Sequence, residues 1–344
     1  MNRKLIASLW AAAVAMAAGP SAGQATFDSA AIAQPHLLAA RKLAAEENNW
    51  RHPALVTCYP FEGQVSQNVN KNLPGAKVFD NLYYVGDGKY GPYAIDTRDG
   101  IILIDAMNSP QDVEQVILPN MRRVGLDPAR LKVLIISHGH GDHFGGARYL
   151  QETFGVRTYL SGPDWDMVEA AGRRPNNRFP VPRRDIEVKD GDTITLGEES
   201  IRVFLSPGHT AASLTMLIPV RDRGQPRLLA YLGGVTNREI GAEMHAAFDR
   251  SAERQIKLFT EAKVDGLLSA HPNYDDAVYK LEQLSAWPDN PNPFLIGTAN
   301  TVLFVKVMKA CNLNNAMLEK AMPTRQTRRE VRRLPSIEPA GPRP

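Results

Sequence analysis

Short apolar runs separated by turn residues dominate the chain from residue 78 onward, and they indicate strands. Uninterrupted segments such as "GIILIDA" (residues 100–106) and "LKVLIIS" (131–137) are typical of strands that a sheet buries on both faces. The same reasoning predicts further strands at 78–86, 92–97, 156–162, 185–188, 192–197, 201–206, 213–219, 227–234 and 264–272.

Helical segments alternate with these strands. Ser109 is a suitable N-cap and Pro110 suits the first helical position, so we expect a helix over residues 109–125. Other helices are expected from residue 143 to about 154 and over 163–172, 251–262, 275–286 and 298–320. No short repeat or Gly/Ser linker divides the chain, so residues 77–322 are interpreted as one domain in which two sheets face each other under helices.

Both ends of the chain differ from this domain. Residues 1–25 combine a positive start (Asn2-Arg3-Lys4), a short apolar stretch and small residues, which is typical of a cleaved signal peptide. We therefore expect a periplasmic or secreted protein that has no membrane segment after cleavage. Residues 26–76 are interpreted as an N-terminal extension, and the Arg- and Pro-rich residues 323–344 as a disordered basic tail.

Composition is ordinary for a soluble protein of 344 residues, with 43% hydrophobic and 22% charged residues. The net charge is only +3, and much of the basic excess lies in the tail, so a nucleic-acid partner is not expected.

Cys58 and Cys311 could form a disulfide in an oxidising compartment, but their spacing leaves the pairing open. Both are distant in sequence from the histidine motif described next, and no catalytic role is assigned to them. The sequence carries no signal for an oligomeric state.

The run "SHGHGDH" (residues 137–143) holds three of the eight histidines in the chain, and it directly follows an apolar strand. A His-x-His spacing lets two imidazoles point the same way from extended backbone. Asp142 and His143 follow where the chain turns into a helix. Imidazole and carboxylate ligands without thiolate suit zinc or another first-row divalent ion.

Four ligands in six residues cannot readily close around one tetrahedral ion, so other segments must contribute. His209 in "SPGHT" and His271 in "SAHP" also follow apolar strands and small residues, as the first motif does. His36, His52 and His245 lack this context and are interpreted as structural or solvent-exposed.

Together these three segments resemble the metallo-β-lactamase superfamily of dinuclear hydrolases over residues 77–284. The resemblance implies a four-layer αββα sandwich with two Zn²⁺ ions. It implies that His138, His140 and His209 bind the first ion, and that Asp142, His143 and His271 bind the second. It also implies a bridging hydroxide as the nucleophile, which Asp142 would orient, and a small-molecule substrate.

The strand end Gly233-Gly234-Val235 distinguishes between members of this superfamily. Glyoxalase-type thioesterases and many lactonases carry a metal-bridging Asp there, and two subclasses of class B β-lactamases carry a cysteine. The chain has neither, so it resembles the third subclass and is expected to open the β-lactam amide. It departs from that subclass in reading "GHTAAS" where Pro-Gly often follows His-Thr.

No residue that would bind a substrate carboxylate is evident, and the nearest candidates are Thr236, Asn237 and Ser213. Two alternatives remain open. The first is an exported hydrolase of the same fold that acts on a lactone, ester or amide. The second is a non-enzymatic binding protein with a relict metal site, which the presence of all six ligands disfavours.

Overall fold

Twelve strands form two sheets in the computed structural model, which describes residues 36, 39–40, 58, 73–236 and 240–321. The expected signal peptide, nearly all of the N-terminal extension and the basic tail lie outside these residues. The seven-stranded sheet contains β1 (Ala76–Lys77), β2 (Leu82–Tyr84), β3 (Tyr93–Thr97), β4 (Gly100–Ile104), β5 (Leu131–Ile135), β6 (Arg157–Ser161) and β7 (Ile186–Val188). The five-stranded sheet contains β8 (Thr193–Leu196), β9 (Glu199–Leu205), β10 (Leu214–Asp222), β11 (Gln225–Leu232) and β12 (Gly266–Ser269).

The strands of the first sheet lie in sequential order, and their pairing changes from antiparallel to parallel along the sheet. Its strands β1 to β4 pair antiparallel as a meander, and β4 to β7 pair parallel through helical crossovers. The second sheet has the order β12-β11-β10-β9-β8, with antiparallel neighbours except for the parallel pair β11 and β12. Because β5, β9 and β12 each end at a loop that carries histidines, this topology decides where the predicted ligands lie.

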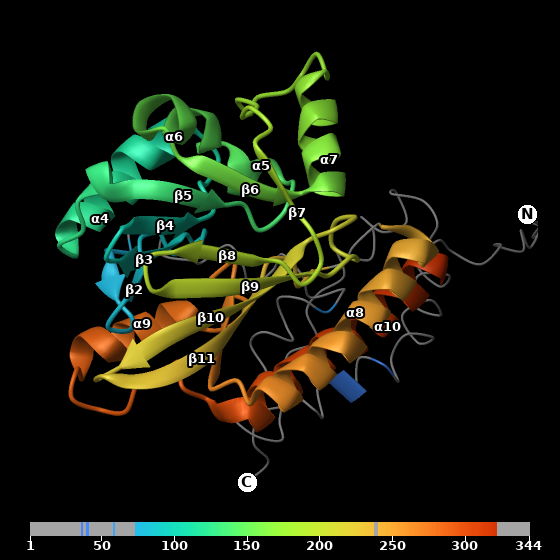
Figure 1. The fold of residues 1–344 in the computed structure, drawn as a ribbon. Coiled ribbons are helices and arrows are strands. Elements are labelled where there is room, and N and C mark those ends of the chain that lie inside the picture. The colour runs from blue at the N-terminus through green and yellow to red at the C-terminus, as the bar shows by residue number, and fades with distance from the viewer. Residues whose placement is uncertain (1–35, 37–38, 41–57, 59–72, 237–239, 322–344) are drawn as a thin grey trace, which may run out of the picture.

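Helices cover the outer face of each sheet (Figure 1). The predicted cap at Ser109 is confirmed, since its Oγ accepts a hydrogen bond from the Asp112 N–H at 3.1 Å. The helical segments are α3 (Pro110–Asp112), η2 (Val113–Ile117), α4 (Leu118–Arg123), η3 (Pro128–Arg130), α5 (Gly141–Phe144), α6 (Ala147–Phe154), α7 (Gly162–Gly172), α8 (Gly241–Ala262), α9 (Ala277–Ala286) and α10 (Gly297–Ala321).

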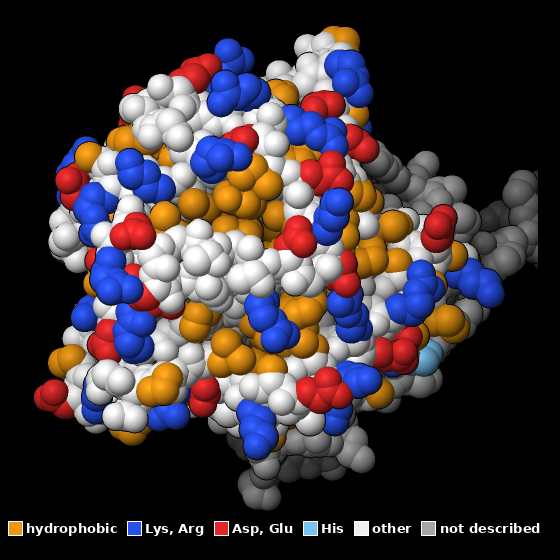
Figure 2. Space-filling view, viewed as in Figure 1, with side chains coloured by type: hydrophobic (Ala, Val, Ile, Leu, Met, Phe, Trp, Pro, Cys, Tyr) orange, Lys and Arg blue, Asp and Glu red, His pale blue; other side chains and the backbone are white. Residues whose placement is uncertain are grey.

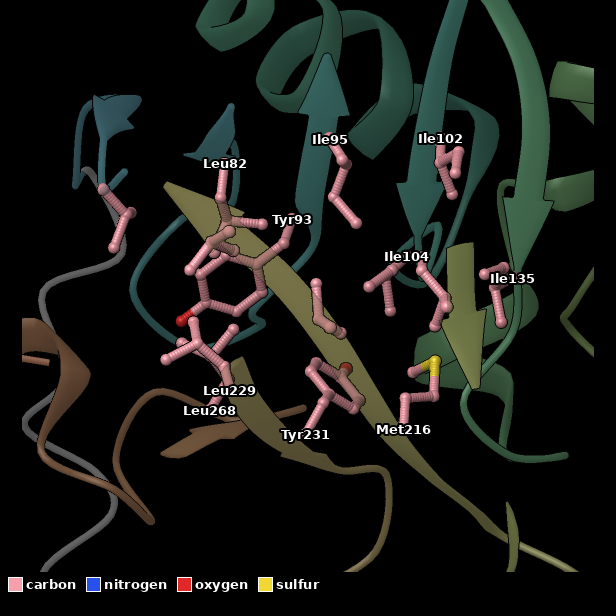
Figure 3. Packing of buried hydrophobic residues seen from close by; sticks show 14 of the residues in the cluster. Leu82, Tyr93, Ile95, Ile102, Ile104, Ile135, Met216, Leu229, Tyr231 and Leu268 are labelled. Carbon is pink, nitrogen blue, oxygen red and sulfur yellow. The ribbon is translucent and has the colours of Figure 1, made fainter. Parts of the chain in front are cut away.

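Three apolar layers separate these elements. Between the sheets, side chains such as Ile104 and Tyr93 from the first sheet point toward Met216 and Tyr231 of the second (Figure 3). A second cluster packs the first sheet against α4 and α6, and a third packs the other sheet against α8 and α10. The expected four-layer αββα sandwich is therefore confirmed.

Two predicted elements differ from the structure. Residues 78–86 were expected as one strand, but the chain turns at Asp80-Asn81, where the Phe79 N–H donates to the Leu82 carbonyl at 3.0 Å. The turn-forming Asp-Asn pair outweighs the apolar run around it. Helix α8 begins ten residues before the predicted position 251, because His245 and Phe248 are buried in its first turns.

Cys58 and Cys311 form a disulfide with a Cα–Cα distance of 4.7 Å, which decides the pairing that the spacing left open. The bond ties residue 58 to α10 across a sequence separation of 253 residues. None of the helices in the described residues has the length and apolarity to cross a membrane.

Candidate metal centre

The ligand loop of residues 137–143 begins where β5 leaves the first sheet. Two buried contacts fix its start: the Ser137 N–H donates to Asp105 Oδ1 at 2.7 Å, and its hydroxyl donates to Asp105 Oδ2 at 2.8 Å. The short helix α5 then begins at Gly141, so that Asp142 and His143 lie in its first turn. This sharp change from strand to helix brings four candidate ligands to one sheet edge.

The first ligand cluster joins this loop to the loop after β9. His138 Nε2 lies 3.1 Å from His140 Nδ1 and 3.1 Å from His209 Nε2. Tetrahedral zinc with Zn–N bonds of about 2.0–2.1 Å separates its nitrogen ligands by about 3.3 Å. The three imidazoles therefore converge at the spacing that a single ion requires, as the sequence predicts.

The second cluster joins the same loop to the loop after β12. His143 Nε2 lies 3.2 Å from His271 Nε2, and Asp142 Oδ2 lies 3.6 Å from each of these nitrogens. All three ligand atoms lie within 4.8 Å of one another, as in the first cluster. The six predicted ligands thus form two adjacent groups of three.

The other ring nitrogen of four histidines faces an oxygen that fixes the ring. His138 Nδ1 lies 3.1 Å from Ser137 Oγ, and His143 Nδ1 lies 2.9 Å from Asp105 Oδ2. His271 Nδ1 faces the Lys89 carbonyl oxygen at 3.1 Å, and His209 Nδ1 faces that of Thr236. Partners of this kind orient the ligands and select the tautomer in metal sites. The donor set and its support therefore fit a pair of divalent ions.

Ionisation in the centre also suits a cation. Burial lowers the pKa of His209 to about 3 and that of His271 to about 4, so both rings are neutral at pH 7. Burial opposes ionisation of Asp142, but His143 and His271 outweigh it and lower the pKa of Asp142 to about 2. Burial also acts against charging His143, yet Asp142 and Asp105 raise its pKa. Neutral imidazoles and an ionised carboxylate are the forms that bind metal, so His209, His271 and Asp142 are already in these forms. A proton on His143 would have to leave before its ring could bind an ion.

Asp105 is a functional residue that sequence reasoning missed. Its carboxylate is 2% exposed and accepts hydrogen bonds from both polar groups of Ser137, from His143 and, at 3.0 Å, from the Tyr231 hydroxyl. Its φ of 63° is in the left-handed region, which directs the chain away from β4. The only sequence signal was an acidic residue at the end of the apolar run "GIILIDA".

Asp164, at the start of α7, was also missed. Its carboxylate accepts hydrogen bonds from the Gly139 N–H at 2.9 Å, from the Thr210 hydroxyl at 2.7 Å and from the Ala212 N–H at 3.2 Å. These contacts tie the ligand loop of the first sheet to that of His209. A single Asp inside a helical pattern gave no signal of this role.

Gly234 leaves no room for a bridging side chain. A Cβ atom at this position would lie 2.4 Å from the Cβ of His209, well inside van der Waals contact. A Cβ at the neighbouring Gly233 would lie 2.8 Å from the Ser137 carbonyl oxygen. Within the described part of the chain, the second cluster therefore consists of Asp142, His143 and His271.

The predicted substrate-binding residues are placed less favourably for their role than the predicted metal ligands are. Ser213 is buried, and its hydroxyl lies 2.7 Å from Thr210 Oγ1, so the structure does not present it to a substrate. Thr236 positions His209 through its carbonyl group, and only 9% of it is exposed. Asn237 lies outside the described residues.

Of the histidines that were left out of the ligand set, the two that the structure describes, His36 and His245, lie in neither cluster. His245 is buried rather than solvent-exposed, and it connects α8 to α10 through Asn312 at 2.7 Å and Glu319 at 3.0 Å. This placement gives it the structural role that was one of its two expected roles. His36 is half-buried, and His52 lies outside the described residues.

Comparisons with known proteins agree with this geometry. Residues 92–222 match the family model described as the metallo-beta-lactamase superfamily. The chain superposes on BJP-1, a subclass B3 metallo-β-lactamase of Bradyrhizobium japonicum, with a TM-score of 0.58 and 26% identity over 70% of this chain and 91% of that one. It also superposes on FEZ-1 of Legionella gormanii with a TM-score of 0.63 and 22% identity, over 74% of this chain and 99% of that one.

Curated sequences point to a second kind of relative. A hydroxyacylglutathione hydrolase of Chelativorans sp. is 34% identical over 127 residues, which are 37% of this chain and 42% of that protein. The match to a second protein of this name, from Gloeothece citriformis, spans 39% of its length. The chain thus covers less than half of these relatives. The family model over residues 92–222, the sandwich and the two candidate ligand clusters nevertheless agree, and they identify a metallo-β-lactamase superfamily domain in this chain.

Proposed function

We propose that the protein is a di-zinc hydrolase that opens the amide of β-lactam rings, which would inactivate antibiotics of this class. The observation that carries this proposal is the ligand set of the second cluster, which among the residues that the structure describes consists of Asp142, His143 and His271 with no bridging carboxylate or thiolate. The likeness to subclass B3 enzymes supports it. Members of this superfamily use metal to hydrolyse small molecules, which agrees with this proposal.

The residues have separate roles in this reaction. Bound divalent ions supply a nucleophile at neutral pH and polarise the substrate carbonyl. His138, His140 and His209 would hold the first ion, and Asp142, His143 and His271 the second. Asp142 is ionised at neutral pH and can orient the attacking water with its carboxylate. Asp105 holds the His143 ring, and Asp164 holds the backbone of the ligand loop.

A second candidate is hydrolysis of a thioester or another ester, which the similarity to hydroxyacylglutathione hydrolases favours. The strand end Gly233-Gly234-Val235 argues against it, because it offers no carboxylate where such thioesterases are expected to carry a bridging Asp. The β-lactam proposal is therefore preferred.

We further propose that the protein acts in the periplasm or outside the cell. The signal-like residues 1–25 support export, and the Cys58–Cys311 disulfide supports an oxidising compartment. Figure 2 shows basic and acidic side chains interspersed over one face, and such a surface suits a small-molecule enzyme better than a nucleic-acid binder.

The test is a hydrolysis screen of zinc-loaded mature protein against penicillins, cephalosporins, carbapenems, lactones and thioesters. Turnover of at least one β-lactam class is expected, with loss of activity on chelation and no effect of inhibitors that acylate an active-site serine. Rapid thioester or lactone turnover without hydrolysis of any β-lactam would replace this proposal with the second candidate.

A further inference from the structure

An exposed lysine lies beside the second ligand cluster, on the loop between β2 and β3. Neither Ser213 nor Thr236 offers a charged group to a substrate. Lys89 is exposed, and its backbone carbonyl oxygen lies 3.1 Å from Nδ1 of the ligand His271. Among the described residues, no carboxylate forms an ion pair with its ammonium group. A cation is thus available at the edge of the centre.

The backbone of this loop is held firmly in place. The Gly91 N–H donates to the Ala270 carbonyl oxygen at 2.9 Å, next to His271. Asp87 Oδ1 accepts from the N–H groups of Lys89 and Tyr90, each at 2.9 Å. The side chain of Lys89 therefore starts from a fixed point relative to the second cluster, which lowers the entropy lost when it binds a ligand.

Aromatic contacts direct the lysine side chain. The Lys89 Nζ atom lies 4.9 Å from the centroid of the Tyr90 ring, and that centroid lies 5.7 Å from the centroid of His271. A lysine ammonium is charged at neutral pH. The cation is thus stacked on the ring that borders the ligand.

A similar pair lies against the ligand loop. Phe179 packs on Gly141, where an added Cβ would lie 2.4 Å from the ring, and the Arg178 guanidinium lies 5.0 Å from the centroid of Phe179. Two aromatic rings therefore border His271 and the ligand loop, and a cation lies over each ring. This surrounding favours a substrate that has both an anionic group and an apolar body.

We propose that Lys89 binds the carboxylate of the substrate and makes the centre selective for anionic substrates. This inference rests on the proposed hydrolase function and names a specificity residue for it. The ammonium would donate a charge-assisted hydrogen bond to the carboxylate while the scissile carbonyl faces the ligand clusters. Lys89 acts on binding rather than on the reacting atoms, so its loss should raise KM and leave kcat nearly unchanged.

The test compares a chromogenic cephalosporin bearing a free carboxylate with its neutral methyl ester, using zinc-loaded protein. Lys89→Gln should raise KM for the acid by about 10- to 100-fold, the range for a hydrogen bond to a charged group, and leave KM for the ester unchanged. Lys89→Arg should retain the preference for the acid. Lys257→Gln, an exposed change on the outer helix α8, is the matched control and should alter neither value.

A binding measurement separates this inference from the proposed reaction. Calorimetric titration with a chemically ring-opened penicillin needs no turnover, and Lys89→Gln should weaken its binding by a similar factor without changing the zinc content. Wild-type protein that binds this carboxylate through Lys89 but opens no β-lactam would overturn only the proposed reaction. Equal losses for acid and ester, or no loss in either measurement, would overturn the role of Lys89.

Discussion

Single residues outside the two clusters determine how the candidate ligands are placed. Asp105 joins the end of β4 to Ser137, His143 and Tyr231, so one carboxylate connects both sheets to the second cluster. Asp164 performs the corresponding task for the backbone of the loops that carry His140 and His209. The ligand geometry therefore depends on a small number of buried carboxylates.

Asp105→Asn tests this dependence, since asparagine keeps the size of the side chain and removes its charge. Affinity for the second zinc ion should fall by about 10- to 100-fold, the usual effect of losing such a partner. Competition titration with a chromophoric chelator measures it. His245→Gln changes a buried histidine outside the clusters and should leave zinc affinity unaltered. Equal zinc affinities for Asp105→Asn and wild type would contradict the prediction.

Gly234→Ala should damage the first cluster, because the new methyl group would lie 2.4 Å from the Cβ of His209 and must displace it. We expect turnover to fall at least about tenfold with a lower zinc content by elemental analysis, since a misplaced ligand costs orders of magnitude in rate. Gly224→Ala is the control, because its φ of 79° is strained but no atom lies within 4 Å. It should lower stability alone, and similar zinc loss in both variants would refute the steric explanation.

The two clusters of candidate ligands could be predicted from the sequence, and the residues that support them could not. Each ligand histidine follows an apolar strand that ends in small residues, and the dense run at 137–143 directed attention to His209 and His271. Asp105 and Asp164 are isolated acids whose partners lie 25 to 126 residues away along the chain. The spacing of residues within a short segment gives no information on contacts between residues so far apart in sequence.

At the scale of elements, apolar runs located most strands, and errors arose where turns or tertiary packing decided the outcome. The Asp80-Asn81 turn divides a predicted strand, and the start of α8 depends on packing against α10 that no periodicity reveals. The disulfide from residue 58 to α10 belongs to the same scale, because it fastens a distant segment onto the outer helical layer.

Replacing both cysteines with serine tests how much the disulfide between residue 58 and α10 contributes to stability. The bond closes a segment of 253 residues, so its loss should lower the free energy of unfolding by about 2–5 kcal/mol. Urea denaturation of the double variant, without reductant, measures the change. Zinc content and turnover should stay the same, since neither cysteine lies in the ligand clusters. An unchanged unfolding midpoint would show that the bond contributes nothing to stability.

At the scale of the whole molecule, the centre spans the two sheets. Four ligands follow β5 of the first sheet, whereas His209 and His271 follow β9 and β12 of the second. The αββα arrangement was predictable through the family resemblance, and it explains why ligands so far apart in sequence meet. The pattern of strands and helices did not predict which strands pair antiparallel and which pair parallel.

Acid should destabilise the metal-free protein. The pKa values of His209 and His271 lie at about 3 and about 4 in the folded state, below the ordinary 6.5, so below pH 6.5 the unfolded chain binds protons that the native state does not. Stability is therefore lost as the pH falls from 6.5 toward 3, and the raised pKa of His143 offsets part of this loss. Thermal denaturation of chelator-treated protein should show a falling Tm, and a Tm that rises from pH 7 to pH 4 would contradict it.

Zinc should in turn raise Tm, because an ion bound by ligands from both sheets binds only the folded chain. A free zinc concentration one hundred times the dissociation constant adds about 2.7 kcal/mol to the free energy of unfolding. A Tm that is independent of zinc would argue against binding across the sheets.

In a zinc-starved cell, a larger fraction of the molecules would be unfolded and exposed to proteases. The amount of this protein, and not only its rate of turnover, would then follow the zinc supply of its compartment.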